Sequence, residues 1–320
     1  MCKPTKEDSG LLFFTPLRYN GSNSIHGSGG VGLQNGKIIK LVGGVYTVFG
    51  DDGIRYERKP LGLFRYRKIY PKVGDDVLFD AESITQLLPR RNEMVRPAVA
   101  NVDHILIVSS CKEPTFSFQL LDRFLALVIH AGIDPVILVT KTDLMTEAEM
   151  EVLSGKLAYY QKYFPVFYTS AKALPGIPEL REWFKGKIVV LSGQTGAGKS
   201  SILNTIDPSL RLETNEISKA LGRGKHTTRH VELLRIGDGW VADTPGFSKL
   251  DFVGFDARTL HECYPDFLEH RDECRFHGCI HINEPGCRIK ELVRSGAILP
   301  ERYDHYQRLV EEIKATKPIF

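Results

Sequence analysis

Long apolar runs are absent from this 320-residue sequence. The sequence contains no stretch of about 18 apolar residues, which is the length needed to cross a membrane. The N-terminus also lacks the compact apolar core that follows basic residues in a secretion signal. We therefore expect a cytoplasmic protein that does not bind a membrane. Net charge is scarce as well, at only +3, so a surface for nucleic acid must be a local patch and not a field of the whole molecule.

Cysteine is sparse, with six residues in the chain. Three disulfides are conceivable, but they would not persist in a reducing compartment. Cys274, Cys279 and Cys287 crowd into one short segment, which favours a metal over disulfide bridges. The remaining composition, 42% apolar and 25% charged, is typical of soluble globular proteins, and the length predicts two or three domains.

The first part of the chain changes character near residue 36. Residues 1–35 are expected to form a flexible tail, because the stretch Asn20–Gly30 is polar and glycine-rich without periodicity. Residues 36–91 read as short strands between glycine or proline turns, namely Lys37–Leu41, Val45–Phe49, Ile54–Arg58, Lys68–Tyr70 and Asp76–Phe79. Five short strands at this spacing predict a small closed β-barrel of the OB type. A linker is expected at Leu87–Asn92.

The predicted barrel combines cations with aromatic residues. The cations are Arg55, Arg58, Lys59, Arg65, Arg67, Lys68 and Lys72, interleaved with Tyr56, Phe64, Tyr66 and Tyr70. Cations suit phosphates and aromatic rings suit stacked bases, so this composition is typical of an RNA-binding face. The alternative is an ordinary solvated surface over core aromatics.

Residues 92–250 predict a doubly wound α/β domain. Continuous apolar runs indicate strands buried on both faces, at Ile105–Val108, Val136–Val139, Val166–Tyr168, Ile188–Leu191, Leu233–Ile236 and Trp240–Ala242. Helices are expected at Leu120–His130 and at Thr146–Tyr163, the second with a cap at Thr146 and Glu149. Strands alternating with helices place a ligand at the carboxyl ends of the strands. Residues 251–320 are expected to be helical, with one cysteine-rich loop.

A glycine-rich loop follows the strand Ile188–Leu191. It reads G-Q-T-G-A-G-K-S-S, comprising Gly193, Gln194, Thr195, Gly196, Ala197, Gly198, Lys199, Ser200 and Ser201. Glycines let successive N–H groups turn toward an anion, and the helix that follows adds its positive end. Lys199 then reaches the β- and γ-phosphates, and the Ser200 hydroxyl is placed to bind Mg²⁺. This chain is predicted to bind a nucleoside triphosphate.

Two further segments fit a triphosphate site. Asp243 closes the strand Trp240–Ala242 and precedes Thr-Pro-Gly, so its carboxylate can hold a water on Mg²⁺ and the Gly246 N–H can meet the γ-phosphate. Between this motif and the glycine-rich loop lies G-R-G-K-H-T-T-R-H, in which Thr228 or Thr227 could supply a second protein oxygen to Mg²⁺. The alternative for the latter segment is a solvated basic loop.

The nucleotide is predicted to be guanine. The strand Val136–Val139 runs into Thr140, Lys141, Thr142 and Asp143. A carboxylate at the tip of a strand accepts two hydrogen bonds from the N1–H and the exocyclic amine of guanine, whereas adenine would leave that charge unpaired. The Lys141 stem can cover the base plane. Ser170, Ala171 and Lys172 follow the next strand and would add a backbone N–H to the guanine oxygen.

These motifs together resemble the TRAFAC GTPases in a permuted order. Ordinary members run from the phosphate loop through D-x-x-G to N-K-x-D and S-A-K, whereas here T-K-T-D and S-A-K come first. With a barrel before and a cysteine/histidine loop after, the chain resembles the ribosome small subunit-dependent GTPase A family over about residues 36–315. G-R-G-K-H-T-T is similar to that family's switch element. Thr140 stands where the usual motif has Asn, and a hydroxyl replaces only part of the amide's hydrogen bonding.

The cysteine-rich loop predicts a structural zinc site. Three thiolates, Cys274, Cys279 and Cys287, lie in one short loop with two histidines, His277 and His281. Zn²⁺ takes three thiolates and an imidazole tetrahedrally, and four protein ligands leave no open position for catalysis. The family resemblance favours His281 over His277 and implies one zinc per chain. Cys2, Cys111 and Cys263 are not expected to bind the metal.

Three functions from different classes fit these motifs. The resemblance implies a monomeric GTPase that binds GTP or GDP with Mg²⁺, binds rRNA through the barrel and the zinc domain, and assists late maturation of the small (30S) ribosomal subunit. Alternatives are an RNA-binding module with incidental hydrolysis and a small-molecule kinase, although a kinase has no need of a guanine clamp. Phe247 stands where many GTPases place a glutamine that orients the attacking water. His226 is therefore the candidate catalytic group, ordered together with Thr227 and Thr228 when the protein docks on the subunit.

Overall fold

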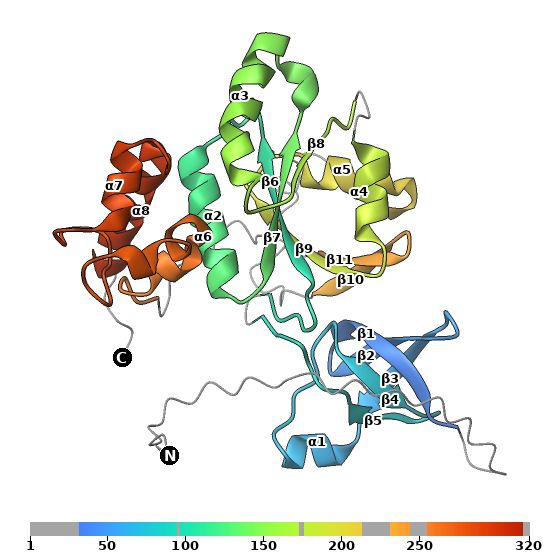
Figure 1. Ribbon diagram of the computed structural model, residues 1–320. Helices are drawn as coiled ribbons and strands as arrows, with labels where there is room; N and C mark the ends of the chain where they lie inside the picture. The colour runs from blue at the N-terminus through green and yellow to red at the C-terminus, as the bar shows by residue number, and fades with distance from the viewer. Residues whose placement is uncertain (1–31, 95–96, 173–175, 213–230, 244–254, 316–320) are drawn as a thin grey trace, which may run out of the picture. The chain divides into compact units, whose positions relative to one another are not determined.

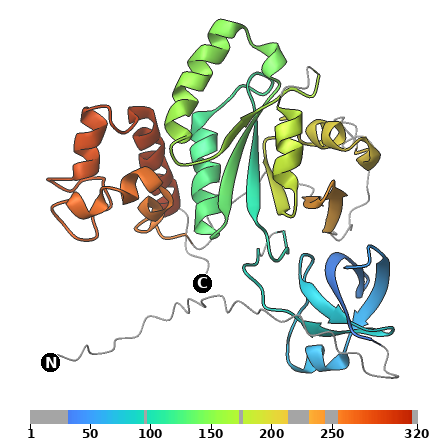
Figure 2. The same cartoon turned by 45° about the vertical axis from the view of Figure 1, so that its right-hand side comes forward.

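The computed structural model describes residues 32–94, 97–172, 176–212, 231–243 and 255–315. The expected tail, the predicted switch loop that carries His226, Thr227 and Thr228, and the Gly246 end of the D-T-P-G motif lie outside these ranges. Figures 1 and 2 show the described elements from two sides. Within the described residues, none of the helices combines the length and the apolar character needed to span a lipid bilayer.

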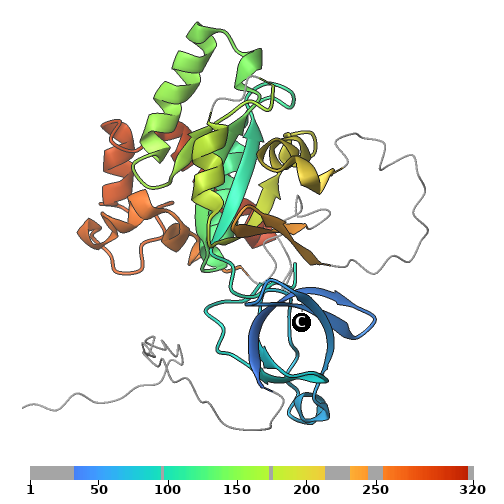
Figure 3. The same ribbon diagram turned by 90° about the vertical axis from the view of Figure 1, so that its right-hand side faces the viewer.

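The first described elements form a five-stranded barrel, as predicted. Its strands are β1 (Gln34–Val42), β2 (Val45–Gly50), β3 (Arg55–Pro60), β4 (Asp76–Phe79) and β5 (Ser83–Leu87), with the short helix α1 (Gly62–Tyr66) between β3 and β4. The strand order is β2-β3-β5-β4-β1, and β1 also pairs with β2, which closes the sheet on itself. Figure 3 shows the strands curving into a ring. Alternate side chains point inward and are fully buried, among them Ile38, Val48, Val77 and Ile84.

The prediction of one barrel strand is wrong. Lys68–Tyr70 was expected to be extended, but Lys68 has a φ of 55° and follows α1 in a turn. A left-handed residue cannot continue a strand. The turn forms because α1 buries Phe64 in the barrel and the Ile69 N–H donates back to the Phe64 carbonyl. The fifth strand is instead β5, part of which lies in the segment expected to be a linker.

The central α/β unit has the predicted strands and helices. Its strands are β6 (His104–Ser110), β7 (Asp134–Thr140), β8 (Val166–Tyr168), β9 (Ile188–Gly193), β10 (Glu232–Ile236) and β11 (Gly239–Asp243), in the order β10-β11-β9-β6-β7-β8. All neighbours are parallel except β10, which pairs antiparallel with β11. The parallel strands therefore bring their carboxyl ends to one edge, where a ligand is expected.

Helices cover both faces of this sheet (Figure 1). On one face lie α2 (Phe118–His130) and α3 (Glu147–Tyr160), and on the other lie α4 (Ile177–Phe184) and α5 (Lys199–Ile206). Alternation along β6 explains this: Ile105 and Ile107 pack with α2 and α3, whereas Leu106 and Val108 pack with α4 and α5. The predicted capping box of Thr146 and Glu149 at the start of α3 is confirmed. That helix ends at Tyr160, three residues earlier than expected.

The last described residues form a small helical unit around the cysteine-rich loop. Its elements are η4 (Leu260–Cys263), α6 (Pro265–Leu268), η5 (Arg271–Glu273), α7 (Arg288–Arg294) and α8 (Pro300–Ala315). Helix α8 buries an apolar stripe, with Tyr306, Leu309 and Val310 at 3% exposure or less. Ala126 and Leu127 of α2 belong to the same apolar cluster. One face of α2 thus packs on the sheet and another on the C-terminal core.

Gly74 offers a test of the packing beside β4. Its φ is 94°, and an added Cβ would lie 2.1 Å from the carbonyl oxygen of Ala100. We predict that Gly74→Ala lowers the free energy of unfolding by about 3 kcal/mol or more, because it adds a steric clash to the strain of a left-handed residue. Gly53→Ala is the matched control, since Gly53 has a φ of 80° with nothing within 4 Å, and it should cost about 1 kcal/mol. Urea denaturation measures both, and equal losses would contradict the packing described.

Candidate nucleotide site and metal centre

The glycine-rich loop joins β9 to α5 at the carboxyl edge of the sheet. Gly193 has a φ of 133°, and a Cβ there would lie 2.1 Å from the Val108 carbonyl oxygen of β6. Gly196 and Gly198 have φ of 82° and 90°, so all three glycines adopt conformations that other residues rarely take. Helix α5 begins at Lys199, directly after the loop. Its free N–H groups therefore open toward the loop, as an anion site requires.

Lys199 lies inside this loop. Its Nζ donates to the carbonyl oxygens of Gly193 and Gln194, at 2.9 and 2.8 Å. Burial lowers the pKa of Lys199 from its usual value. A partly desolvated ammonium held by two neutral carbonyls would gain from a nearby anion, since attraction between charges strengthens as water is excluded.

The predicted guanine loop occupies the end of the neighbouring strand. Strand β7 ends at Thr140, Lys141 takes a left-handed φ of 59°, and Thr142–Leu144 form one turn of 3-10 helix, η1. The Ser170 hydroxyl donates to Asp143 Oδ1, and the backbone N–H of Lys172 donates to the same hydroxyl at 3.1 Å. The structure thus brings T-K-T-D and S-A-K together, as the sequence motifs require.

Thr140 links this loop to the phosphate loop. Its side chain is 1% exposed, and Oγ1 donates to the carbonyl oxygen of Ala197 at 2.6 Å. The T-K-T-D loop and the glycine-rich loop are therefore joined by a buried hydrogen bond between residues 57 positions apart. The sequence had suggested that threonine replaces only part of the bonding of asparagine. In this structure the hydroxyl forms the bond that joins the two loops.

The sequence predicted no role for Cys111, but in the structure this residue contacts the backbone of the T-K-T-D loop. Its buried Sγ donates to the carbonyl oxygens of Thr140 and Lys141, both at 3.0 Å. Burial raises the pKa of this thiol, so it stays protonated as a donor. The feature of the sequence that could have indicated this contact is the position of Cys111 directly after β6, the strand that pairs with β7.

The Mg²⁺ segment is described only up to Asp243. This residue ends β11, which runs parallel to β9, so the D-T-P-G motif begins at the same sheet edge as the glycine-rich loop. The candidates Gly246, Thr227, Thr228 and His226 lie outside the described residues. The glycine-rich loop, the T-K-T-D loop and the start of the D-T-P-G motif therefore all lie at this edge of the sheet.

Comparison with known proteins identifies the family. A family model described as RsgA GTPase matches residues 87–253, and one described as RsgA N-terminal domain matches residues 35–86. The chain belongs to the RsgA GTPase family. It is accordingly a GTP hydrolase, and the predicted membership of a permuted GTPase family is confirmed.

Individual relatives agree over most of the chain. The small ribosomal subunit biogenesis GTPase RsgA 2 of Oceanobacillus iheyensis is 47% identical over 292 residues, covering 89% of this chain and 99% of the relative. The RsgA protein of Halalkalibacterium halodurans is 45% identical over 288 residues, covering 88% and 98%. Among solved structures, YjeQ from Thermotoga maritima matches with a TM-score of 0.78 at 33% identity, covering 89% of this chain and 100% of YjeQ. YloQ, described as a circularly permuted GTPase, matches with a TM-score of 0.77 at 36% identity, covering 90% and 98%.

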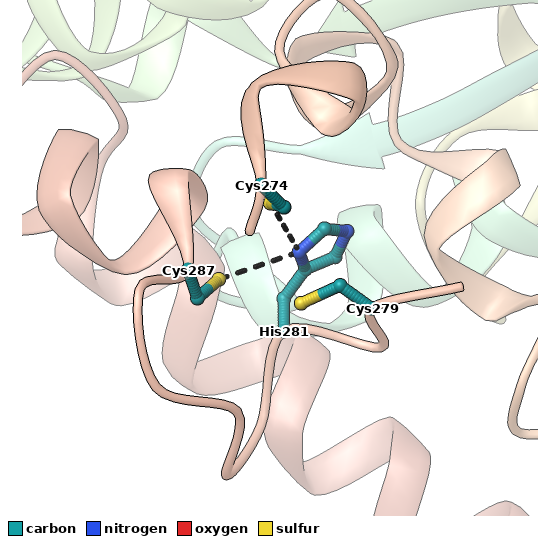
Figure 4. Close-up of side chains that lie close together, drawn as sticks. All are labelled: Cys274, Cys279, His281 and Cys287. Carbon is teal, nitrogen blue, oxygen red and sulfur yellow. Dashed lines mark hydrogen bonds between the residues drawn. The ribbon is translucent and has the colours of Figure 1, made fainter. Parts of the chain in front are cut away.

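The RsgA-type C-terminal unit carries a cluster that can hold a metal ion (Figure 4). Cys274, Cys279, His281 and Cys287 each offer one ligand atom, and these atoms lie within 4.8 Å of one another. The Nδ1 atom of His281 lies 3.6 Å from Cys274 Sγ and 3.4 Å from Cys287 Sγ. In a tetrahedral zinc site, the usual bond lengths place sulfur and nitrogen about 3.6 Å apart. Both of these sulfur–nitrogen distances are thus close to the spacing that a bound ion would need.

The electrostatics of the cluster also fit a cation. Burial is the main cause that raises the pKa of Cys279 to about 12 and lowers that of His281 to about 4. A neutral imidazole is ready to act as a ligand, and a cation is what stabilises neighbouring thiolates. His277, the rival histidine from the sequence, does not belong to the cluster.

Neighbouring groups hold the metal loop in place. Tyr303 and Tyr306 of α8 donate to the carbonyl oxygens of His281 and Ile280, both at 2.6 Å. The Glu284 carboxylate accepts backbone N–H groups from Ile280, Ile282 and Asn283, at 2.9 to 3.1 Å. These bonds orient the ligands from outside, as the groups behind metal ligands generally do.

The assignment of Cys274, Cys279, His281 and Cys287 as metal ligands can be tested by substitution. Cys279→Ala and His281→Ala should each lose the bound metal, because three ligands bind a structural ion far more weakly than four. His277→Ala and Cys263→Ala are the matched controls and should keep about one ion per chain. Elemental analysis of purified protein measures this. Retention of a full equivalent of metal by both ligand variants would show that the assignment is wrong.

Proposed function

We propose that this protein is a GTPase that assists maturation of the small ribosomal subunit. Relatives that match 98% and 99% of their own length are named small ribosomal subunit biogenesis GTPases. The proposed cycle has the GTP-bound protein dock on the subunit, hydrolyse GTP and leave. We infer that it acts as a monomer in the cytoplasm.

The observation that carries this proposal is the junction of the base loop with the phosphate loop. Asp143 is oriented by Ser170, and Thr140 donates to Ala197 in the phosphate loop. A nucleotide bound across this edge would have its base at Asp143 and its phosphates at Gly193–Ser201. Guanine supplies two donors to the Asp143 carboxylate and adenine supplies none, so the loop would select guanine.

Mg²⁺ is proposed to accompany the nucleotide. The Ser200 hydroxyl at the start of α5 would bind the ion, and Asp243 would hold one of its waters. Thr228 or Thr227 would add a second protein oxygen when the triphosphate is bound. His226 would orient the attacking water, because Phe247 offers no hydrogen bond for that role.

Zinc is the proposed ion of the Cys/His cluster. Three thiolates and one imidazole form a set that borderline-soft Zn²⁺ prefers, and four protein ligands leave no position for substrate. The metal would therefore stabilise a loop in a unit of about 60 residues, which is too small to rely on an apolar core alone. We propose domain limits of 36–91 for the barrel, 92–250 for the GTPase domain and 251–320 for the zinc domain.

The barrel offers a surface suited to rRNA. Tyr66 and Tyr70 are 86% and 67% exposed, and Arg65, Arg67 and Lys68 beside them are exposed as well. Within the described residues these three cations have no carboxylate within ion-pair distance. Exposed rings with unpaired cations favour stacked bases and phosphates over an ordinary solvated surface. Phe64, by contrast, is a core residue of the barrel.

The geometry weakens one of the two alternative functions and leaves the other to be separated by experiment. A small-molecule kinase would not need the Asp143 loop. An RNA-binding module with incidental hydrolysis would share every contact described, and it differs only in whether the subunit stimulates turnover. Turnover in the presence of 30S subunits therefore separates it from the proposed function.

Asp143→Asn tests the base pocket. We predict that the variant binds GTP about hundredfold more weakly or worse, because hydrogen bonds to a charged group are lost. It should gain affinity for xanthosine triphosphate, whose additional oxygen accepts from the new amide. Asp134→Asn, at the exposed opposite end of β7, is the control and should bind GTP as the wild type does. Equilibrium titration with both nucleotides measures this, and an unchanged guanine preference would remove Asp143 from the pocket.

The subunit dependence is tested by turnover with and without 30S subunits. Wild-type hydrolysis should be slow alone and at least about hundredfold faster with subunits, corresponding to about 3 kcal/mol of barrier. His226→Ala should bind GTP and the subunit normally but lose most of the stimulation. His230→Ala in the same segment is the control and should be stimulated as the wild type is. Equal turnover of wild type with and without subunits would refute the proposed function.

A further inference from the structure

A buried network of charges lies between the GTPase helices and the C-terminal unit. Arg302, in the first turn of α8, is 1% exposed, as are Asp122 of α2 and Asp266 of α6. Its Nε and Nη2 donate to the two oxygens of Asp266 at 2.9 and 3.0 Å. Its Nη1 donates to Asp122 Oδ1. One guanidinium therefore joins two carboxylates from elements 144 residues apart in the chain.

Two tyrosines of α3 complete the network. The Tyr160 hydroxyl donates to Asp122 at 3.1 Å, and the Tyr159 hydroxyl donates to Asp266 at 2.8 Å. The Arg302 guanidinium also lies over the rings of Tyr160 and Tyr264, 5.2 and 4.5 Å from their centroids. His305 Nδ1 lies 2.7 Å from Asp122. Helices α2, α3, α6 and α8 all contribute to this network.

Such a network is a poor source of stability but fixes one arrangement. Removing charges from water costs much of what their attraction returns, whereas a partner left alone in the interior is strongly unfavourable. Arg302, Asp122 and Asp266 each have partners from two other helices, so the helices can shift relative to one another only by breaking several of these bonds. The network therefore sets where α2 and α3 lie.

Helix α2 leads from Asp122 directly to the guanine loop. It begins after the cap Ser117, and the residues just before it contact the loop at consecutive positions. The Cys111 thiol donates to the Thr140 and Lys141 carbonyls. Lys112 Nζ donates to the Leu144 carbonyl at 3.2 Å, and Lys141 Nζ donates to the Glu113 carbonyl. A displacement of the start of α2 would therefore move the contacts that hold residues 140–144.

Helix α3 leads to the same loop from its other end. Its cap is Thr146, which follows the loop immediately, and Tyr159 and Tyr160 form its last turn. Lys112 also forms an ion pair with Glu149 in the first turn of α3, at 3.0 Å. The loop Thr140–Met145 is thus held between two helices, and both helices contact the Arg302 network.

We propose that Arg302 is a remote positioning residue for the guanine site. Through Asp122 it positions α2, and through Tyr159 and Tyr160 it positions α3, so that the C-terminal unit sets the geometry of the loop that contains Asp143. Seating of that unit would then raise the affinity for guanine nucleotide, and bound nucleotide would stabilise the seating to the same extent. This inference rests on the guanine site proposed above.

The test is the dissociation rate of nucleotide from Arg302→Met, whose side chain has similar length but no charge. Fluorescent methylanthraniloyl derivatives of GDP and of IDP are the probes, since inosine lacks the exocyclic amine that Asp143 would bind. We expect GDP to leave the variant about tenfold faster, with the ratio of the IDP rate to the GDP rate falling toward one. Dissociation is measured only from molecules that have bound nucleotide, so partial unfolding does not change it. Arg308→Met is the matched control, because Arg308 also lies on α8 and contacts Gln119 of α2 at 3.3 Å on the surface.

A milder variant keeps the proposal testable if Arg302→Met does not fold. The double variant Tyr159→Phe/Tyr160→Phe removes two hydroxyls and leaves Arg302 between its aspartates, and it should release GDP about threefold faster. Tyr163→Phe, which removes an exposed bond to Glu269, is its control. Unchanged rates in the variants that fold, or equal acceleration of GDP and IDP, would overturn the positioning role. Wild-type protein that releases the two nucleotides at one rate would overturn the guanine site itself, and this proposal with it.

Discussion

The hydrogen bond from Thr140 to the Ala197 carbonyl joins the two halves of the nucleotide site. One half is the loop after β7, with Asp143 at its tip, and the other is the glycine-rich loop after β9. Strand β6 separates the two strands, and its own end provides Cys111, which holds the backbone of the first loop. A parallel sheet brings strand ends to one edge but does not fix the distance between loops. Here a buried hydroxyl fixes it.

The permuted order of motifs changes what these loops are attached to. The base loop is preceded by α2 and followed by α3. Helix α2 contacts α8 through the bond of Asp122 to Arg302, and α3 contacts α8 through the Tyr160 ring, over which the Arg302 guanidinium lies. From the same helix α8, Tyr303 and Tyr306 donate to backbone carbonyl oxygens of the Cys/His loop. A single helix thus contacts both the metal loop and the helices of the nucleotide site. The C-terminal unit is accordingly part of the framework of the GTPase domain.

The sequence predicted most of this fold because its signals are local. Apolar runs gave the strands, Thr146 and Glu149 gave the start of α3, and cysteine spacing gave the cluster at Cys274–Cys287. It failed at Lys68–Tyr70, where burial of Phe64 by a short helix overrides the extended pattern. It also gave Cys111 no role and did not single out Asp122, Asp266 or Arg302. Their roles depend on partners far away in the chain, which neither periodicity nor motif spacing can identify.

The central claim is that one loop selects guanine while a second loop, tied to it, holds the phosphates. Competition for bound nucleotide tests this most directly. Wild-type protein loaded with radiolabelled GTP and Mg²⁺ is challenged with an equal concentration of unlabelled GTP, GDP or ATP, and the retained label is measured. We expect both guanine nucleotides to displace the label and ATP to leave it in place. Displacement by ATP as effective as that by GTP would contradict the claim.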